Sequence, residues 1–339
     1  MDENYKYTPL IEPIPIIEQV WPEGTIPLVH TRTMTYNHEN FIRDCIEGIL
    51  MQKTTFPVQV LIHDDASTDK TAEIIKEYES KYPHLIKAFY QEENSYSMPD
   101  KHKRREVFMT WRIGKYEAMC EGDDYWTDPL KLQKQVEFLE ANPDFSMCFH
   151  NAMLLYEDDK SKNRPFTELE EREYSPIEIF SKWTIPTASV VFRVSMYQKV
   201  SHPDFMYGDI VLFLNLATKG KLRAINEVMS VYRIHSAGIT NSLRNNTLEY
   251  KEKYLKHLIA IKNSFNNKYE SFINTRLSLR YIELANLQLR SGKKSFYKSL
   301  KKSFLYSYKY NSIAYFIKIL LLDFFLIKLI LKKIHISVH

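Results

Sequence analysis

The sequence predicts an α/β protein built on a Rossmann-like, mostly parallel sheet flanked by helices. About the first 125 residues alternate between β-branched apolar segments and segments with apolar residues at helical spacing. Two predicted strands end in adjacent aspartates, Asp64–Asp65 and Asp123–Asp124, where open α/β sheets bind their ligands. With 339 residues, 44% hydrophobic and 26% charged, the chain has the size and composition of one large or two ordinary globular domains.

The N-terminal residues 1–27 contain five prolines and little periodicity, which predicts an extended lead-in lying over the body. The polar, acidic start has no secretory pattern, so we expect a cytoplasmic protein. Cys45, Cys120 and Cys148 are far apart, and each lies in an apolar segment. We therefore expect buried free thiols in a reducing compartment.

The first half is expected to alternate between strands and helices, with Asn37 as N-cap of the first helix and Thr68 or Asp69 as cap of the second. The predicted strands cover 27–34, 57–63, 85–90 and 116–120, and the predicted helices 41–50, 69–78 and 101–111. Such alternation requires parallel strands with right-handed crossovers. Acids about 60 residues apart would then meet at one edge of the sheet.

The second half continues the pattern less regularly. The expected elements are a helix from Pro129 to about 142, a strand over 145–156, a solvated acidic loop over 157–160, a helix over 175–183, a strand over 187–193, a helix over 210–217 and a strand over 221–233. Pro129 is expected at the first helical position, where its missing N–H is tolerated.

The composition and the hydrophobic pattern of the sequence change from residue 247 onward. Residues 248–302 have a helical period, and residues 312–334 are more apolar but interrupted by Lys318, Asp323, Lys328 and Lys332. No charge-free run approaches the ~20 residues of a spanning helix. Residues 291–335 hold ten lysines and one acid, which favours a membrane surface over nucleic acid. An interfacial helix, a helix docked on a partner and a helix packed on its own domain all remain open.

The stretch with the clearest chemistry is Glu121-Gly122-Asp123-Asp124, followed by two aromatic residues. Clustered carboxylates repel one another unless a cation joins them. Oxygen ligands favour a hard divalent ion, Mg²⁺ or Mn²⁺, and hence a phosphate-bearing substrate. The competing interpretation is a solvated acidic turn.

Four motifs occur in a characteristic order, and together they resemble the family 2 glycosyltransferases, inverting enzymes of the GT-A fold, of the bacterial polysaccharide-assembly type. They are residues 35–39 (TYNHE), 49–53 (ILMQK), 63–71 (HDDASTDKT) and 121–126 (EGDDYW). The likeness runs over about residues 28–241. It implies three regions: the lead-in 1–27, a GT-A domain over 28–246, and a basic helical extension over 247–339 that is a candidate for membrane contact.

The resemblance also implies roles on the donor side. Asp64 or Asp65 would accept a hydrogen bond from the nucleotide base, and Thr35 and Asn37 would lie on the nucleotide side. Asp123 matches the last aspartate of the family's Asp-x-Asp motif and would hold the metal. Glu121 replaces the first aspartate of that motif, and Asp124 would face the donor sugar or a metal-bound water.

On the acceptor side, Asp209 occupies the place of the family's catalytic acid and would take the proton from the attacking hydroxyl. It could also cap the helix over 210–217. His235 could ligate the metal or touch the diphosphate, or it could be a loop histidine. Arg233 could contact phosphate or pair with an acid. His38, His63 and His150 are expected to be structural.

The resemblance predicts transfer of a sugar from a nucleotide-diphosphate donor, a UDP-sugar first, to a glycan or lipid-linked acceptor. The metal would stabilise the leaving diphosphate. The alternative is a catalytically silent GT-A module that binds nucleotide-sugar or organises an assembly complex. A nucleotidyltransferase would need a glycine-rich phosphate loop near the first strand, which this sequence lacks. A nucleic-acid partner is not expected.

Overall fold

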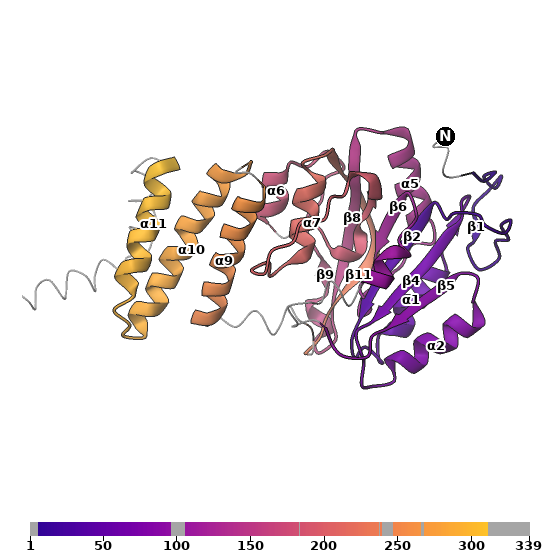
Figure 1. Ribbon diagram of the computed structural model, residues 1–339, viewed down its shortest axis with the longest axis horizontal. Coiled ribbons are helices and arrows are strands. Elements are labelled where there is room, and N and C mark those ends of the chain that lie inside the picture. The colour runs from indigo at the N-terminus through magenta and orange to yellow at the C-terminus, as the bar shows by residue number, and fades with distance from the viewer. Residues whose placement is uncertain are drawn as a thin grey trace, which may run out of the picture. The chain divides into compact units, whose positions relative to one another are not determined.

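The computed structural model describes residues 6–95, 106–182, 184–236, 238, 247–265 and 268–310. The chain divides into two compact units, described separately below (Figure 1). The first comprises Met1–Lys199 and Leu212–Gly238, and the second comprises Val200–Val211 and Ile239–His339. The apolar segment predicted over 312–334 lies outside the described residues, as do residues 101–105 of the predicted basic helix.

The first unit is organised around a nine-stranded sheet of order β5-β4-β2-β6-β10-β8-β11-β7, with β9 paired to β8. Its strands are β2 (Val29–Thr35), β4 (Val58–Asp64), β5 (Ile86–Tyr90), β6 (Tyr116–Met119), β7 (Tyr125–Trp126), β8 (Phe145–Tyr156), β9 (Arg164–Pro165), β10 (Val191–Arg193) and β11 (Lys221–Ile234). β5, β4, β2 and β6 are parallel neighbours, as are β8 and β11. The predicted fold class is confirmed, with β7, β9 and β10 as antiparallel exceptions.

Helices cover both faces of this sheet. They are α1 (Ile42–Leu50), α2 (Thr71–Lys81), α4 (Glu106–Thr110), α5 (Lys131–Ala141), α6 (Pro176–Ser181) and the end of α7 (Gly208–Leu216), whose residues up to Val211 belong to the second unit. Residues of α1, α2 and α5 join alternate residues of β2, β4 and β6 in one core. On the opposite face, Phe108 of α4 packs edge-on against His63 of β4. The alternation follows from the two-residue period of a strand.

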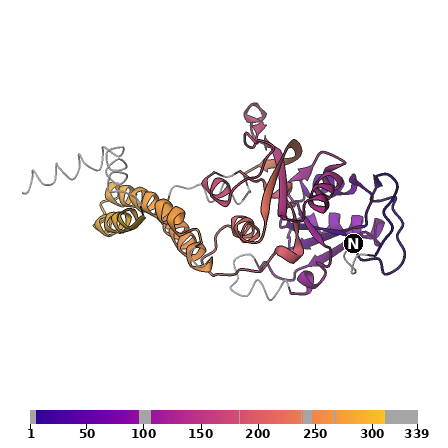
Figure 2. The ribbon, with the colours of Figure 1, turned by 90° about the horizontal axis from the view of Figure 1, so that it is seen from above.

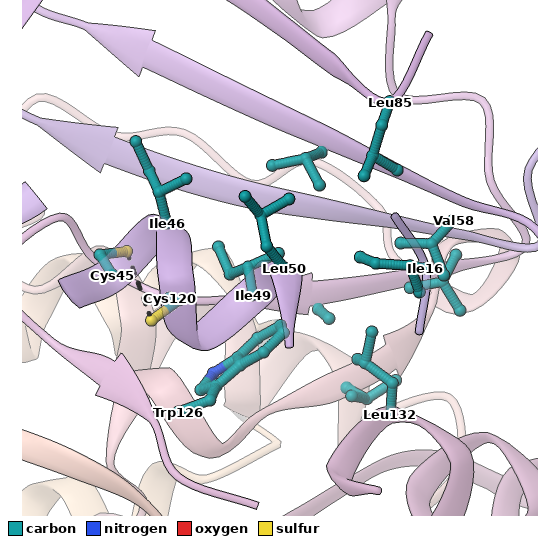
Figure 3. Close-up of a cluster of buried hydrophobic side chains, with 14 of the residues drawn as sticks. Ile16, Cys45, Ile46, Ile49, Leu50, Val58, Leu85, Cys120, Trp126 and Leu132 are labelled. Carbon is teal, nitrogen blue, oxygen red and sulfur yellow. Dashed lines mark hydrogen bonds between the residues drawn. The ribbon is translucent and has the colours of Figure 1, made fainter. Parts of the chain in front are cut away.

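The core between α1 and the sheet is densely packed (Figure 3). Cys45, Ile46 and Ile49 of α1 are fully buried, and the Cys45 sulfur lies 3.7 Å from that of Cys120. A side chain at Gly48 would have no room, because a Cβ there would lie 2.8 Å from the Trp126 backbone. All three cysteines are buried and free, as expected.

The lead-in reaches the body through a small two-stranded sheet, in which β1 (Ile14–Pro15) pairs with β3 (Lys53–Thr54). Ile16 is buried, and the amide of Gln19 donates to the Thr54 carbonyl at 2.7 Å. These contacts join the start of the chain to the segment that follows α1.

Two local predictions in the second half of the unit are wrong. The strand predicted over 187–193 begins with a single turn of 3-10 helix, η2 (Thr187–Ser189), and only β10 is extended. Helix α5 begins at Lys131, so Pro129 lies before the helix. The Asp128 carboxylate accepts from the Leu130 N–H at 2.7 Å and organises the turn between them.

The second unit contains three helices within the described residues: α9 (Leu248–Ser264), α10 (Glu270–Arg290) and α11 (Phe296–Tyr310). α10 contacts both α9 and α11, and the three helices lie side by side in both ribbon views (Figures 1 and 2). Thr247 caps α9 by accepting from the Tyr250 N–H at 3.1 Å.

Candidate active site

The predicted acids lie at the edge of the sheet where β4, β2 and β6 end. β2 stands between the other two strands, and all three run in the same direction. The Asp65 N–H donates to the Thr35 carbonyl at 3.0 Å, and the Gly122 N–H donates to the Met34 carbonyl at 2.9 Å. Both acidic segments are therefore fastened to the last two residues of β2, in the crevice where open α/β sheets bind ligands.

Asp64 and Asp65 are buried and hold the loops that follow β4 and β5. The Asp64 carboxylate accepts from the Ser67 N–H at 3.1 Å, and Asp65 accepts from the Ser95 hydroxyl at 2.7 Å. Burial raises the pKa of Asp64 despite its hydrogen bonds with Ser67. In these contacts both residues shape loops at the edge where a nucleotide would lie.

Asn37 joins the loop after β2 to the loop after β4. Its side-chain oxygen accepts from the Thr68 N–H at 2.8 Å, and its own N–H donates to the Ser67 hydroxyl at 2.9 Å. The prediction that Asn37 caps the first helix is wrong, because Phe41 is the N-cap residue and has no side-chain cap bond. Asn37 instead has a φ of +54°, a left-handed conformation that asparagine tolerates better than most residues.

The helix α2 lacks the predicted Thr68 cap as well. Lys70 is its N-cap residue, without a side-chain cap bond. The Asp69 carboxylate accepts from the Thr71 N–H at 2.9 Å and from the Glu39 N–H at 3.0 Å. Asp69 thus serves the first turn of α2 and also ties it to the loop that carries His38.

Gly122 permits the close approach of the acidic motif to β2. A Cβ at this position would lie 2.6 Å from the Thr35 Cβ and 2.9 Å from Nδ1 of His38. Thr35 and His38 are themselves 3.2 Å apart, from Oγ1 to Nδ1. The glycine therefore lets the chain pass directly over these two side chains and brings Asp123 beside His38.

Asp123 lies between two imidazoles. Its Oδ2 is 3.1 Å from Nε2 of His235 and 3.9 Å from Nε2 of His38. Burial would raise the pKa of Asp123, but the hydrogen bond with His235 and the proximity of His38 outweigh it and lower the pKa. Burial lowers the pKa of His38. The Asp123 side chain is 23% exposed, so this carboxylate remains accessible to a ligand.

Asp124 and Glu121 differ from Asp123 in their surroundings. Asp124 is buried, and one of its oxygens accepts from the Arg233 N–H at 2.9 Å. Burial, followed by the charge of Asp123, raises the pKa of Asp124 well above its usual range. Glu121 is half-buried and close enough to Arg32 to act on it electrostatically. Asp124 therefore anchors β11, whereas Glu121 lies beside a guanidinium.

Arg233 pairs with acids, which is one of the two roles expected for it. Its guanidinium donates to Glu157 at 2.9 Å, to Asp44, and to the Asp123 carbonyl at 3.2 Å. It also lies over the ring of Tyr125, 4.5 Å from the centroid. Glu157 is thus an ion-pair partner, and the prediction that the loop beginning there is only solvated is wrong at this residue. These contacts hold β11 beside the acidic motif two residues before His235.

Asp209 belongs to the second unit and is described there by itself. It lies in the first turn of α7, which begins at Gly208, and accepts from the Ile210 N–H at 2.8 Å. Burial raises its pKa. The segment before it is held by α9, because the Met206 N–H donates to Nδ1 of His257 at 3.2 Å.

The donor set at the edge fits a divalent cation bound jointly by protein and substrate. Within the described parts of the chain, no group of three or more His, Cys, Asp or Glu side chains is placed to hold a metal. Asp123 and His235 are nevertheless adjacent, and one carboxylate with one imidazole suits Mn²⁺ or Mg²⁺ when phosphate and water supply the remaining ligands.

Sequence reasoning expected His38 to be structural, although on the nucleotide side, and did not single out Asp44. His38 lies three residues beyond the end of β2. Residues just beyond the ends of parallel strands are candidates for ligand binding, and this position was the signal that the sequence offered. Asp44 gave no such signal, because it lies on α1 and is 189 residues from Arg233 in sequence.

Comparison with known proteins identifies the family of this chain. Residues 33–201 match the family model "Glycosyl transferase family 2". An uncharacterised protein of Mycobacterium tuberculosis is 38% identical over 211 residues, covering 62% of this chain and 60% of its own length. The match thus spans less than two thirds of that relative. The Escherichia coli protein WfaP, named a UDP-Glc:α-D-GlcNAc-diphosphoundecaprenol β-1,3-glucosyltransferase, is 27% identical over 63% of this chain and 80% of its own.

Two solved structures share the fold at low sequence identity. S. aureus TarS in complex with UDP-GlcNAc has a TM-score of 0.59 and 16% identity, over 81% of this chain and 79% of that chain. The mannosyltransferase PcManGT of Pyrobaculum calidifontis, in complex with GDP-Man and Mn²⁺, has a TM-score of 0.52 and 14% identity, over 86% and 89%. These two structures show the fold, and the family model shows that the chain belongs to glycosyltransferase family 2.

Proposed function

We propose that the protein is an inverting glycosyltransferase that moves a sugar from a nucleotide-diphosphate donor to a hydroxyl of a glycan or lipid-linked acceptor. The observation that carries the proposal is the Asp123–His235 pair, 3.1 Å apart, at the edge where β4, β2 and β6 end. A UDP-sugar is the first donor to test, because WfaP is named for UDP-Glc and TarS was solved with UDP-GlcNAc.

Asp123 and His235 would hold Mg²⁺ or Mn²⁺; the complex of PcManGT with GDP-Man contains Mn²⁺. When bound, the ion would neutralise charge that develops on the leaving diphosphate. The chain's own contribution is to keep both side chains in place. Arg233 holds β11 through its bonds to Glu157 and to the Asp123 carbonyl.

The donor side would be completed by the loops after β2 and β4. Asp64 or Asp65 would accept from the nucleotide base, and Thr35 and Asn37 would shape the nucleotide pocket. The contact of Asn37 with the Thr68 N–H supports this, because it joins the two loops. Glu121 and Asp124 would bound the donor-sugar side of the pocket.

Asp209 would act as the base that takes the proton of the acceptor hydroxyl. Its raised pKa, caused by burial, makes the carboxylate a stronger proton acceptor than an ordinary surface aspartate. Its position in the first turn of α7 leaves one carboxylate oxygen without a hydrogen bond among the described contacts of that helix.

A lipid-linked acceptor would place the enzyme at the inner face of the cytoplasmic membrane, with residues 291–335 as the candidate contact region. The described part of that region, residues 291–310, contains α11.

The test measures donor binding and sugar transfer in parallel. We expect Mn²⁺ with UDP-sugars to raise the melting temperature more than GDP- or dTDP-sugars do, and donor hydrolysis or transfer to be lost in Asp123→Asn and Asp209→Asn. The matched control is Asp158→Asn, which changes an exposed acid in the loop after β8. Binding of a nucleoside diphosphate with Mn²⁺, but no turnover with any acceptor pool, would support the alternative of a silent nucleotide-sugar-binding module.

A further inference from the structure

Helix α11 buries three serine side chains and exposes several of its large apolar ones. Ser299, Ser303 and Ser307 recur every four residues and are all buried. Tyr297 and Leu305 are 59% and 55% exposed. A surface helix in water normally has the opposite arrangement, with its apolar stripe toward the core. Phe296 and Leu300 follow this rule, because they pack with Leu289 of α10, but α11 also buries three serines and leaves three large apolar side chains exposed.

The buried stripe is held by hydrogen bonds to α10. The Ser303 hydroxyl donates to the Ser278 carbonyl at 2.8 Å, and the Ser278 hydroxyl is 2.6 Å from that of Ser307. The Ser299 hydroxyl donates to the Gln288 side chain at 2.9 Å. Small residues at four-residue spacing, with hydroxyls bonded across the interface, are typical of helix pairs whose outer faces meet lipid.

The outer face of α11 combines apolar and basic groups. Tyr297, Lys301, Phe304 and Leu305 follow the spacing of one helix face, and Lys298 lies beside them; all five are exposed. The sequence of α11 contains no acidic residue. Lysines and large apolar side chains on a single exposed face are characteristic of helices that lie in the interface of an anionic membrane.

A spanning role does not fit this helix. Among the helices that the structure describes, none is long and apolar enough to cross a bilayer. Exposed single apolar residues are ordinary on soluble proteins, as with Ile177 in the first unit, which is 51% exposed. On α11 three such residues share one face with lysines, which points to a surface contact rather than to a crossing.

We propose that the outer face of α11 binds an anionic lipid surface. Phe304, Leu305 and Tyr297 enter the headgroup region, and Lys298 and Lys301 pair with lipid phosphates. The positive charge of this face is the reason for assigning a lipid surface and not a second copy of the chain, because two such faces would repel one another. The proposal does not depend on the transfer reaction.

The test is co-sedimentation of the full-length protein with vesicles of phosphatidylglycerol and phosphatidylcholine, or of phosphatidylcholine alone. We expect binding to the anionic vesicles only, weakened at least tenfold by high salt. The double variants Phe304→Ser/Leu305→Ser and Lys298→Glu/Lys301→Glu should each raise the lipid concentration needed for half-binding at least tenfold. Ile177→Ser, an exposed apolar residue of the first unit, is the matched control and should bind like the wild type.

Melting temperatures of all variants should match the wild type, because every changed side chain is exposed. Donor turnover with a water-soluble acceptor should also be unchanged, so failure of this proposal is distinguishable from failure of the proposed transfer. Equal vesicle binding by both double variants would overturn the proposal, as would no binding by the wild type. Self-association that Phe304→Ser/Leu305→Ser abolishes, without vesicle binding, would assign the face to a second copy.

Discussion

Two clusters pair a carboxylate with cationic or imidazole partners, one within the sheet and one in the segments just beyond its strands, and they have different roles. In the interior, Glu117 of β6 is bonded to His30 and Arg32 of β2 at 3.0 and 2.7 Å, and to Arg112. At the edge, Asp123 lies between His38 and His235. The Glu117 side chain is 1% exposed and that of Asp123 is 23% exposed.

The two clusters differ in the chemistry of the groups that surround the carboxylate. Burial alone would raise the pKa of Glu117, but the Arg32 and Arg112 charges outweigh it and hold that pKa well below its usual range. Guanidinium groups do not lose their protons in proteins, so the interior cluster keeps one state. Neutral imidazoles can instead bind a cation beside the Asp123 carboxylate. We therefore expect the interior cluster to determine stability and the edge cluster to determine activity.

The largest expected effect is on activity at the edge. Asp123→Asn should reduce sugar transfer about a thousandfold, equivalent to about 4 kcal/mol of transition-state stabilisation, because the carboxylate that would bind the cation is lost. The free energy of unfolding should change by less than about 1 kcal/mol, since the side chain is partly exposed. Initial rates and urea unfolding measure the two quantities. Retention of more than a tenth of the activity would remove Asp123 from the site.

The next effect is on stability in the interior. Glu117→Gln should lower the free energy of unfolding by about 3 kcal/mol, because it leaves the half-buried Arg32 and Arg112 without their buried counter-charge. The kcat of the folded enzyme should stay within a few-fold of wild type. Glu140→Gln is the matched control, since Glu140 pairs with Lys115 but its side chain is 44% exposed, and such pairs contribute about 0–1 kcal/mol. Equal effects of the two substitutions would contradict the comparison.

The interior cluster should also make stability depend on pH. Burial lowers the pKa of His30 below 6.5 in the folded state. Below pH 6.5 the unfolded chain therefore binds a proton that the folded chain does not, and this group's contribution to stability falls as the pH falls, by at most about 1.4 kcal/mol per pH unit. Urea unfolding between pH 5 and 8 should show a shallower decline in His30→Gln than in the wild type. Parallel curves would show that His30 does not titrate differently in the two states.

The smallest expected effect is on the affinity of the edge cluster for a metal ion. His38→Asn should weaken Mn²⁺ binding in the presence of nucleoside diphosphate about tenfold, or about 1.4 kcal/mol, as losses of supporting groups around a metal do. His150→Asn is a control on another histidine outside the edge. Calorimetric titration of Mn²⁺ measures both variants. Unchanged affinity in His38→Asn would reduce His38 to a packing partner of Thr35.

The part of the sheet formed by the parallel strands β5, β4, β2 and β6 could largely be predicted from sequence, because the signals for these strands are local. The apolar alternation of β2, β4 and β6 and the acids just beyond their ends need no knowledge of distant partners. Asp64, Asp65 and the segment from Glu121 to Asp124 could therefore be placed at one edge. What failed locally, the strand over 187–193, failed because the residues after Pro186 form a turn with the Ser189 N–H bonded to the Pro186 carbonyl.

The ion pairs that position β11 could not be predicted, because they depend on packing across long stretches of chain. Arg233 meets Asp44, which is 189 residues away, and Glu157, which is 76 away. The packing of α11 could not be predicted either, because it too depends on a neighbouring element. Its serines and aromatic residues both follow a helical period, and only the neighbouring α10 decides which set is buried.

The end of β11 completes the edge, and this has a consequence during synthesis of the chain. His235 follows Asp123 by 112 residues, so a ribosome-bound chain that lacks β11 would carry the carboxylate with His38 but without His235. The proposed metal-binding pair would therefore form only after β11 has been synthesised and has paired with β8 in the sheet.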